Sequence, residues 1–299
     1  MADALRGEHG TPPGVHDVSD DDLHLALWTA YELHYRGFDD AVDDAEWDPV
    51  VLGVRRQLES RFESDLRDRV GATDLPADVG QYLLDLAEAD DGPSVATFVR
   101  RHATRGQVES LLKERSVYHL KESDPVSWVV PRLDTRPKAA LMELQFDEYG
   151  DGDPTRLHHQ LFADGLVSSG LSNTYGDYVG DASTATLAQN NAVSMFGLHR
   201  RLRGAALGHL AVFEATSSLP SRKMAQGLER LGFSAEMVGY YLEHVEADAV
   251  HEQLAARSIC GALAADEPDQ VGQIVFGARV CLMLETDFAT RTLLAWEAA

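Results

Sequence analysis

The chain has 299 residues, and its 49 acidic residues outnumber its 26 basic residues to give a formal net charge of −23. This charge disfavours nucleic-acid and anionic-lipid partners, because an acidic surface repels phosphate groups. The cysteines, Cys260 and Cys281, exclude a disulfide framework and a zinc ribbon, and a chain of this length can bury an adequate core without either.

The N-terminal region carries no recognisable targeting segment. The first 22 residues lack an apolar stretch behind a basic leader, and no part of the chain is long and apolar enough to cross a bilayer. We therefore expect a cytoplasmic protein with neither a membrane nor a nucleic-acid partner. Residues 1–18 contain Gly10, Pro12, Pro13 and Gly14 without a periodic apolar pattern, which predicts a mobile N-terminal tail.

Helical patterns occupy the rest of the chain. Ser19, followed by three aspartates, predicts a helix start, because a hydroxyl caps the first turn and acids favour the positive end of the helix dipole. This helix is expected to end at Gly37, and a second covers residues 50–70. Further helices are expected at residues 94–121, 138–149, 155–167, 185–217, 221–231, 234–263 and 270–296. Strand patterns are nearly absent, so we predict one helical domain over residues 19–299.

One late helix carries two histidines and an acid at helical spacing. His244, Asp248 and His251 are four and three residues apart, so they share one helix face. Imidazole and carboxylate groups converging from one helix can bind iron or manganese. The alternative is the solvated face of an acidic helix, and this triplet alone does not decide between the two.

A second pattern combines Glu148 with His158, ten residues later. Positions ten apart do not share a face of an unbroken helix. The interruption at residues 150–154 is therefore expected to rephase the helix through a local bulge. The alternative is a calcium loop formed by Asp147, Asp151 and Asp153, although the ligand order and terminal glutamate of an EF-hand are absent.

Two further glutamates complete the set of candidate ligands. Glu214 lies in a run of small and apolar residues, where a buried carboxylate needs a metal, an arginine or a hydrogen-bond partner. Glu122 closes a helix just before the turn at Pro125, where a surface carboxylate is the ordinary interpretation.

These motifs resemble the bacterial iron-containing redox enzymes of the haem-oxygenase-like diiron oxidase superfamily. The resemblance extends from residues 31–38 to the last long helix. Its most specific motifs are Asp147-Glu148-Tyr149-Gly150 with His158, Phe213-Glu214 with Thr216-Ser217-Ser218, and His244-x3-Asp248-x2-His251. It implies an all-α, haem-oxygenase-like helical bundle with additional N-terminal auxiliary helices.

The resemblance also implies the residues that hold two irons. The implied ligands from the core helices are Glu148, His158, Glu214, His244, Asp248 and His251. Members that oxygenate nitrogen add a carboxylate from a helix outside the core, and Glu122 lies at the matching position. No catalytic residue beyond these metal ligands is implied.

The implied activity is that of a non-haem diiron oxygenase, with two Fe(II) ions as cofactors and O2 as co-substrate. Its preferred reaction is N-oxygenation of an amine or guanidine-like nitrogen of a small metabolite, in a biosynthetic role, through a peroxo-diiron intermediate. Four carboxylates would balance the charge of two ferrous ions. No GxGxxG sequence indicates a nicotinamide domain, so we expect an external electron donor. Relatives are often dimers, which makes a homodimer the expected assembly.

Three other functions stay open. The same diiron core could cleave a C–C bond of an amino or fatty acid, which a long apolar tunnel would favour, whereas a smaller polar pocket would favour N-oxygenation. The chain could be a non-enzymatic iron-binding helical protein. It could also be a cofactor-free relative on the same scaffold, although such a protein does not need the full set of carboxylates and histidines.

Overall fold

The computed structural model describes residues 18–298, apart from the side chains of residues 246–250. Every regular element in this part of the chain is a helix, and none of the described residues forms a strand. The prediction of an all-α fold is therefore confirmed. The predicted mobile tail, except for residue 18, lies outside the described residues.

The helices keep one order along the chain, where η marks a 3-10 helix except for η6, which is a π-helix. They are α2 (Asp20–Glu32), η1 (Asp43–Trp47), α3 (Pro49–Val70), α4 (Val79–Glu88), α5 (Val95–Arg101), α6 (Arg105–His119), α7 (Asp124–Ser127), η2 (Val130–Arg132), α8 (Thr135–Glu148), η3 (Gly150–Gly152), α9 (His158–Ser168), η4 (Val179–Asp181), α10 (Thr184–Leu198), η5 (Arg200–Leu202), α11 (Arg203–Arg230), α12 (Ala235–Gln253), η6 (Leu254–Gly261), α13 (Ala262–Asp266), η7 (Pro268–Gln270) and α14 (Val271–Glu297).

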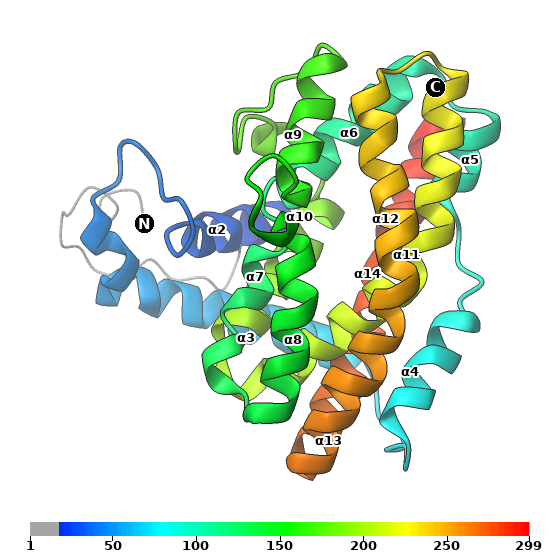
Figure 1. Ribbon diagram of the computed structural model, residues 1–299. Helices are drawn as coiled ribbons and strands as arrows, with labels where there is room; N and C mark the ends of the chain where they lie inside the picture. The colour runs from blue at the N-terminus through cyan, green and yellow to red at the C-terminus, as the bar shows by residue number, and fades with distance from the viewer. Residues whose placement is uncertain (1–17, 299) are drawn as a thin grey trace.

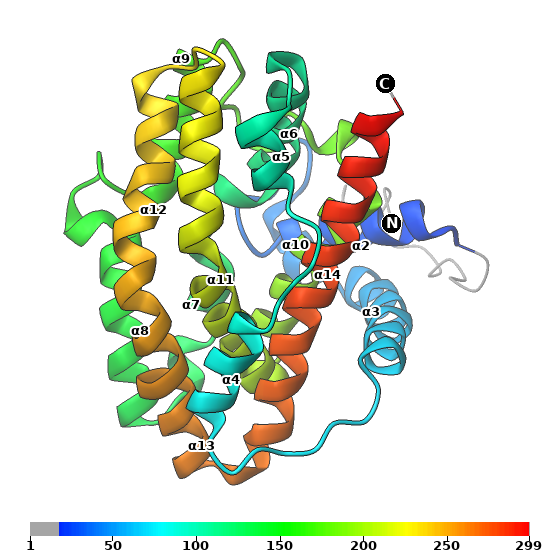
Figure 2. The same ribbon diagram turned by 90° about the vertical axis from the view of Figure 1, so that its right-hand side faces the viewer.

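Long helices of the second half of the chain form the centre of the bundle. Helix α11 packs along both α12 and α14, and the three run side by side in Figures 1 and 2. Helix α9 packs on α12, and α8 packs on η6, which continues the line of α12. Helices α2 and α3 extend from one side of this bundle (Figure 1), as expected for N-terminal auxiliary helices.

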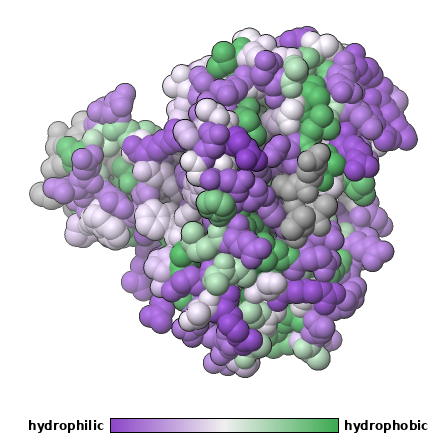
Figure 3. Space-filling model, viewed as in Figure 1, coloured by the Kyte–Doolittle hydropathy of each residue, from purple (hydrophilic) through white to green (hydrophobic). Residues whose placement is uncertain are grey.

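A close backbone approach holds α11 against α14. A Cβ atom added to Gly208 of α11 would overlap the carbonyl group of Ile274 in α14. Only a residue without a side chain allows this separation, so the two helices pack more closely than larger residues permit. Hydrophilic residues cover most of the face shown in Figure 3, in keeping with the acidic composition.

Several predicted helix boundaries were wrong for identifiable reasons. The helix expected at residues 94–121 is two helices, because Thr104 caps a new helix with Gln107 in a capping box. The helix expected at 185–217 breaks after Leu198, and the break expected before residue 221 is absent. Helix α11 continues through Pro220, where packing on α12 and α14 outweighs the missing backbone donor.

The candidate metal centre

Six of the seven predicted ligands meet between helices of the bundle and form two groups. In each group, one ligand atom per residue lies within 4.8 Å of the others, a spacing that could hold a metal ion. We call them the first cluster, Glu122 with His158 and His244, and the second cluster, Glu148 with Glu214 and His251. The seventh residue, Asp248, has a side chain outside the described residues.

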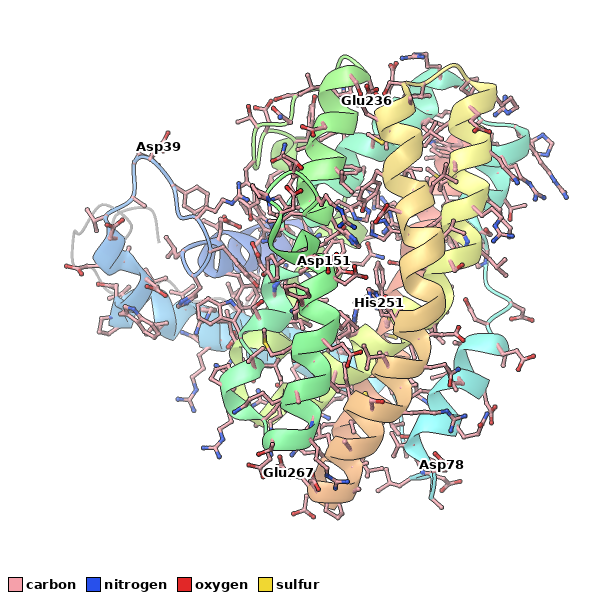
Figure 4. The ribbon with its side chains drawn as sticks, viewed as in Figure 1. Asp39, Asp78, Asp151, Glu236, His251 and Glu267 are labelled. Atoms are coloured by element: carbon pink, nitrogen blue, oxygen red, sulfur yellow. The ribbon has the colours of Figure 1, made fainter. Side chains whose placement is uncertain are left out.

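Five segments supply these side chains. Glu122 lies in the turn between α6 and α7, and Glu148 is the last residue of α8. His158 begins α9, Glu214 lies within α11, and both remaining histidines come from α12. Figure 4 shows His251 directed from α12 toward α8. The clusters therefore depend on the packing of helices that are distant in sequence.

A tight turn brings Glu148 to His158, so the predicted bulge within one helix was wrong. Helix α8 ends at Glu148, and Gly150 and Asp151 adopt positive φ values of 69° and 56° before α9 begins. A Cβ atom at Gly150 would lie 2.6 Å from the backbone carbon of Arg156, so the turn requires glycine there. It places Nδ1 of His158 3.1 Å from Oε2 of Glu148.

The calcium-loop alternative does not agree with the side-chain contacts. The Asp147 carboxylate contacts His251, the Asp151 carboxylate accepts from Arg156, and the Asp153 carboxylate accepts from Thr155. The three acids therefore have separate partners, and none belongs to a described group that could hold a metal.

Glu122 is buried at the centre of the first cluster, so it is not a surface carboxylate. Its Oε2 accepts a hydrogen bond of 2.7 Å from the Tyr240 hydroxyl and lies 2.7 Å from Nδ1 of His119. Its Oε1 has no hydrogen-bond partner and lies 3.3 Å from Nε2 of His244 and 3.7 Å from Nδ1 of His158. Burial raises the pKa of Glu122, but the hydrogen bond with His119 and the nearby imidazole of His244 bring it well below its usual range.

A backbone carbonyl orients His244 within this cluster. Its Nδ1 donates a hydrogen bond of 2.9 Å to the carbonyl oxygen of Tyr240, one turn earlier on α12. Because a carbonyl can only accept, the neutral ring keeps its lone pair on Nε2, the nitrogen that faces Glu122. This is the orientation that a metal-binding histidine needs.

The second cluster adjoins the first through Glu148, which contacts both His158 of the first cluster and His251 of the second. Nδ1 of His251 is 3.3 Å from Oε2 of Glu214 and 3.7 Å from Oε1 of Glu148. Oε2 of Glu148 accepts from the Ser123 hydroxyl at 2.8 Å. Burial lowers the pKa of His251, but the hydrogen bond and charge of Glu214, with the charges of Glu148 and Asp147, raise it to about 9.

The clusters border a cavity of about 80 Å³ that follows one face of α11. That face contributes residues on both sides of Glu214: Ala206, His209, Leu210 and Phe213 before it, and Ser217 and Ser221 after it. Much of the opposing wall is apolar, with Val126, Leu144 and Val193. No described lysine or arginine lines this cavity.

The residues present fit a metal centre. Oε1 of Glu122 and Nδ1 of His158 are buried side-chain atoms without a hydrogen-bond partner, and a cation between such atoms would offset the cost of burying them. Carboxylate and neutral imidazole donors without a thiolate suit iron. Both cysteines are buried, and neither belongs to a cluster.

Four residues that contact the clusters were missed by the sequence analysis: His119, Tyr240, Asp147, and Ser123, whose hydroxyl donates to Glu148. His119 and Tyr240 bond to each other and to Glu122, and Asp147 contacts His251. Helical spacing offered a signal for two of them. His119 precedes Glu122 by three residues, and Tyr240 precedes His244 by four. Asp147 was considered as part of a calcium loop and as the first residue of the Asp147-Glu148-Tyr149-Gly150 motif, but not as a partner of His251.

Together, an all-helical bundle and two buried clusters of glutamate and histidine define a helical protein with a candidate site for two metal ions. The chain belongs to the iron-containing redox enzyme family, which matches residues 109–286. This confirms the resemblance to the haem-oxygenase-like diiron oxidase superfamily and the expected haem-oxygenase-like fold. None of the described helices has the length and apolarity that crossing a membrane requires.

Two crystal structures of a CADD-like protein of unknown function from Nostoc punctiforme share this fold. The structure at 1.35 Å resolution has a TM-score of 0.54 and 17% identity over 72% of this chain and 92% of that chain. The structure at 2.00 Å has a TM-score of 0.55 and 17% identity over 72% of this chain and 95% of that chain. At this identity the likeness concerns the fold alone. The comparison with curated proteins finds no match.

Proposed function

We propose that this protein is an O2-dependent non-haem diiron oxygenase that N-oxygenates an amine or guanidine-like nitrogen of a small metabolite. The observation that carries the proposal is the meeting of two buried glutamate–histidine clusters at one small cavity. The protein's membership of the iron-containing redox enzyme family supports the choice of metal and the class of reaction.

Each cluster would hold one iron. Glu122, His158 and His244 would bind the first, and Glu148, Glu214 and His251 the second, with Asp248 as the predicted seventh ligand. Bound iron would supply the binding and reduction of O2, with electrons from an external donor. The four carboxylates would balance the charge of two ferrous ions.

The other residues of the chain orient this centre and protect it. Tyr240 holds Glu122 through its hydroxyl, and Ser123 holds Glu148 in the same way. The apolar walls of the cavity exclude water from the substrate, which strengthens the electrostatic interactions within it. Reduction of O2 would then take place beside a bound substrate and away from bulk solvent.

The size of the cavity supports a small substrate. A cavity of about 80 Å³ is smaller than the cavity of about 150 Å³ that accepts benzene in an engineered protein core, so it has no room for a long acyl chain. The apolar walls nevertheless favour a second candidate, which is oxidative C–C cleavage of a short substrate at the same centre.

Iron binding is the first test. Anaerobic titration with Fe(II) should reach two irons per chain in the wild type and one in His251→Ala or Glu214→Ala. Mixing the Fe(II) protein with O2 should give a transient visible absorption that both variants lack. A second iron and an unchanged transient in these variants would refute the ligand assignment.

Product analysis then separates the candidate reactions. With a panel of amines and acids, hydroxylamine, nitroso or nitro products support N-oxygenation, whereas aldehydes or alkenes support C–C cleavage. If the protein binds iron but consumes no O2 with any of these compounds, the result would favour the alternative of a non-enzymatic iron-binding protein. Glu122→Ala should retain the second cluster but impair product formation, and unchanged turnover in that variant would remove Glu122 from the centre.

A further inference from the structure

One ionisable side chain of the cavity wall has no role in either cluster. His209 lies on the cavity face of α11 and makes no hydrogen bond with any residue that the structure describes. Its ring stacks on Phe213, with centroids 6.3 Å apart and planes at 20°, and meets Phe196 edge-on at 6.4 Å. Burial lowers the pKa of His209 to about 4, against a small opposing effect of Glu285, so the ring is neutral at pH 7.

The surroundings of His209 are apolar. Ala206 and Leu210 neighbour it on the cavity face of α11, and Val193 of α10 also lines the cavity. A neutral imidazole offers one donor and one acceptor. His209 is half-buried, and its ring nitrogens are not among the fully buried polar atoms, so they are accessible from the cavity that the ring lines. A ligand with a neutral polar group could form hydrogen bonds with them.

The charge of the cavity restricts the same ligand further. Its described lining contains three cluster glutamates and no lysine or arginine. A substrate carboxylate directed away from the clusters would therefore be buried without a counter-charge, which is strongly unfavourable. This wall suits an uncharged group.

We propose that the substrate is a small, largely apolar amine with a neutral hydrogen-bonding group, such as a hydroxyl, at its far end, and that His209 binds this group. The proposal rests on the proposed function and specifies its substrate class. His209 and Glu214 are five residues apart on α11, about 7.5 Å along the helix axis. An extended four-carbon amino alcohol spans a comparable distance.

Three probes of nearly equal length test the proposal: 4-amino-1-butanol, n-pentylamine and 4-aminobutanoate. Their binding to the anaerobic Fe(II) protein is measured by calorimetry, so no turnover is needed. The amino alcohol should bind about five- to tenfold more tightly than the alkylamine, as expected for one net hydrogen bond. The amino acid should bind at least about tenfold more weakly than the amino alcohol.

Substitution of His209 provides the decisive comparison. His209→Phe keeps a ring of similar shape, so n-pentylamine should still bind while the advantage of the amino alcohol disappears. His209→Asn keeps a donor and an acceptor, so part of the advantage should remain. The same exchange at an exposed histidine, His102→Phe, should change none of the affinities.

Several results would overturn the substrate class. The first is that 4-aminobutanoate binds more tightly than the other two probes. The second is that His209→Phe still prefers the amino alcohol to the alkylamine as strongly as the wild type does. The third is that none of the probes binds. A protein that shows the predicted binding order but consumes no O2 would instead contradict the proposed function and leave the substrate class standing.

Discussion

The Asp147 carboxylate lies 2.8 Å from Nε2 of His251, and the other ring nitrogen, Nδ1, faces Glu214 and Glu148. A hydrogen bond from Nε2–H to Asp147 leaves the Nδ1 lone pair for a metal. A carboxylate partner of this kind fixes the tautomer of a metal-binding histidine and makes it a stronger donor. Asp147 is therefore a positioning residue for the second cluster.

Asp147→Asn should weaken metal binding at the second cluster. The exchange preserves the side-chain shape but removes the negative charge, so the Fe(II) affinity of that cluster should fall by about 10- to 100-fold, with the first cluster unaffected. Anaerobic titration followed by Mössbauer spectroscopy would measure the occupancy of each site. Asp151→Asn, in the exposed turn that follows, is the matched control. Equal losses in both variants, or none in Asp147→Asn, would contradict this role.

Tyr240→Phe should affect the other cluster. The variant loses the hydroxyl that donates to Oε2 of Glu122, while His119 still contacts that oxygen. We expect two irons per chain at saturation but an affinity of the first cluster that is about tenfold lower. Tyr241→Phe removes a neighbouring cavity hydroxyl without touching Glu122 and should leave the titration unchanged. Full iron affinity in Tyr240→Phe would contradict this role and show that His119 alone is sufficient to orient Glu122.

Two glycine substitutions should change stability in opposite directions. Gly208→Ala forces a methyl group into the Ile274 backbone and should cost about 1–3 kcal/mol of unfolding free energy by separating α11 from α14. Gly53→Ala, within α3, meets nothing within 4 Å and should add about 0.5–1 kcal/mol through helix propensity. Urea unfolding measures both. A Gly208→Ala protein with the same free energy of unfolding as the wild type would contradict the close approach of the two helices.

Stability should also fall in acid because of His24. Burial lowers the pKa of His24 from 6.5 to about 4, although the charge of Asp20 opposes this, and Nδ1 accepts from the Asn191 amide. As the pH falls, the unfolded chain binds a proton on His24 before the folded protein does. The contribution of His24 to the free energy of unfolding is therefore complete above about pH 6.5, and roughly 3 kcal/mol of it is lost as the pH falls to about 4. Urea unfolding across this range should show a shallower pH dependence in His24→Asn than in the wild type. Equal slopes would contradict the prediction, and exposed His102→Asn serves as the control.

The helical content and most helix positions were predictable from sequence, whereas some boundaries were not. Residues 50–70 matched α3 almost completely, because its apolar period and the glycine that ends it are local signals. Pro220 is a local signal for a helix break, yet α11 continues through it because neighbouring helices hold both halves. Tertiary packing overrode the local preference there.

The candidate ligands were predictable as residues but not as two clusters. The spacing of His244 and His251 on one helix and the family motifs identified them, and their role as iron ligands stays a prediction. Sequence reasoning treated these two as members of one set, whereas the structure puts His244 with Glu122 and His251 with Glu214. From the local sequence alone, Glu122 was interpreted as an ordinary surface carboxylate.

The sequence alone determined the helical class, the family and the residue types available for metal binding, because periodicity and ligand chemistry are properties of short segments. Only the tertiary structure decided that Glu122 meets Tyr240, 118 residues away, that Asp147 contacts His251, and that His209 lines a cavity. These contacts join segments that are far apart along the chain. They arise from how helices pack, and no local pattern specifies which helix faces will meet.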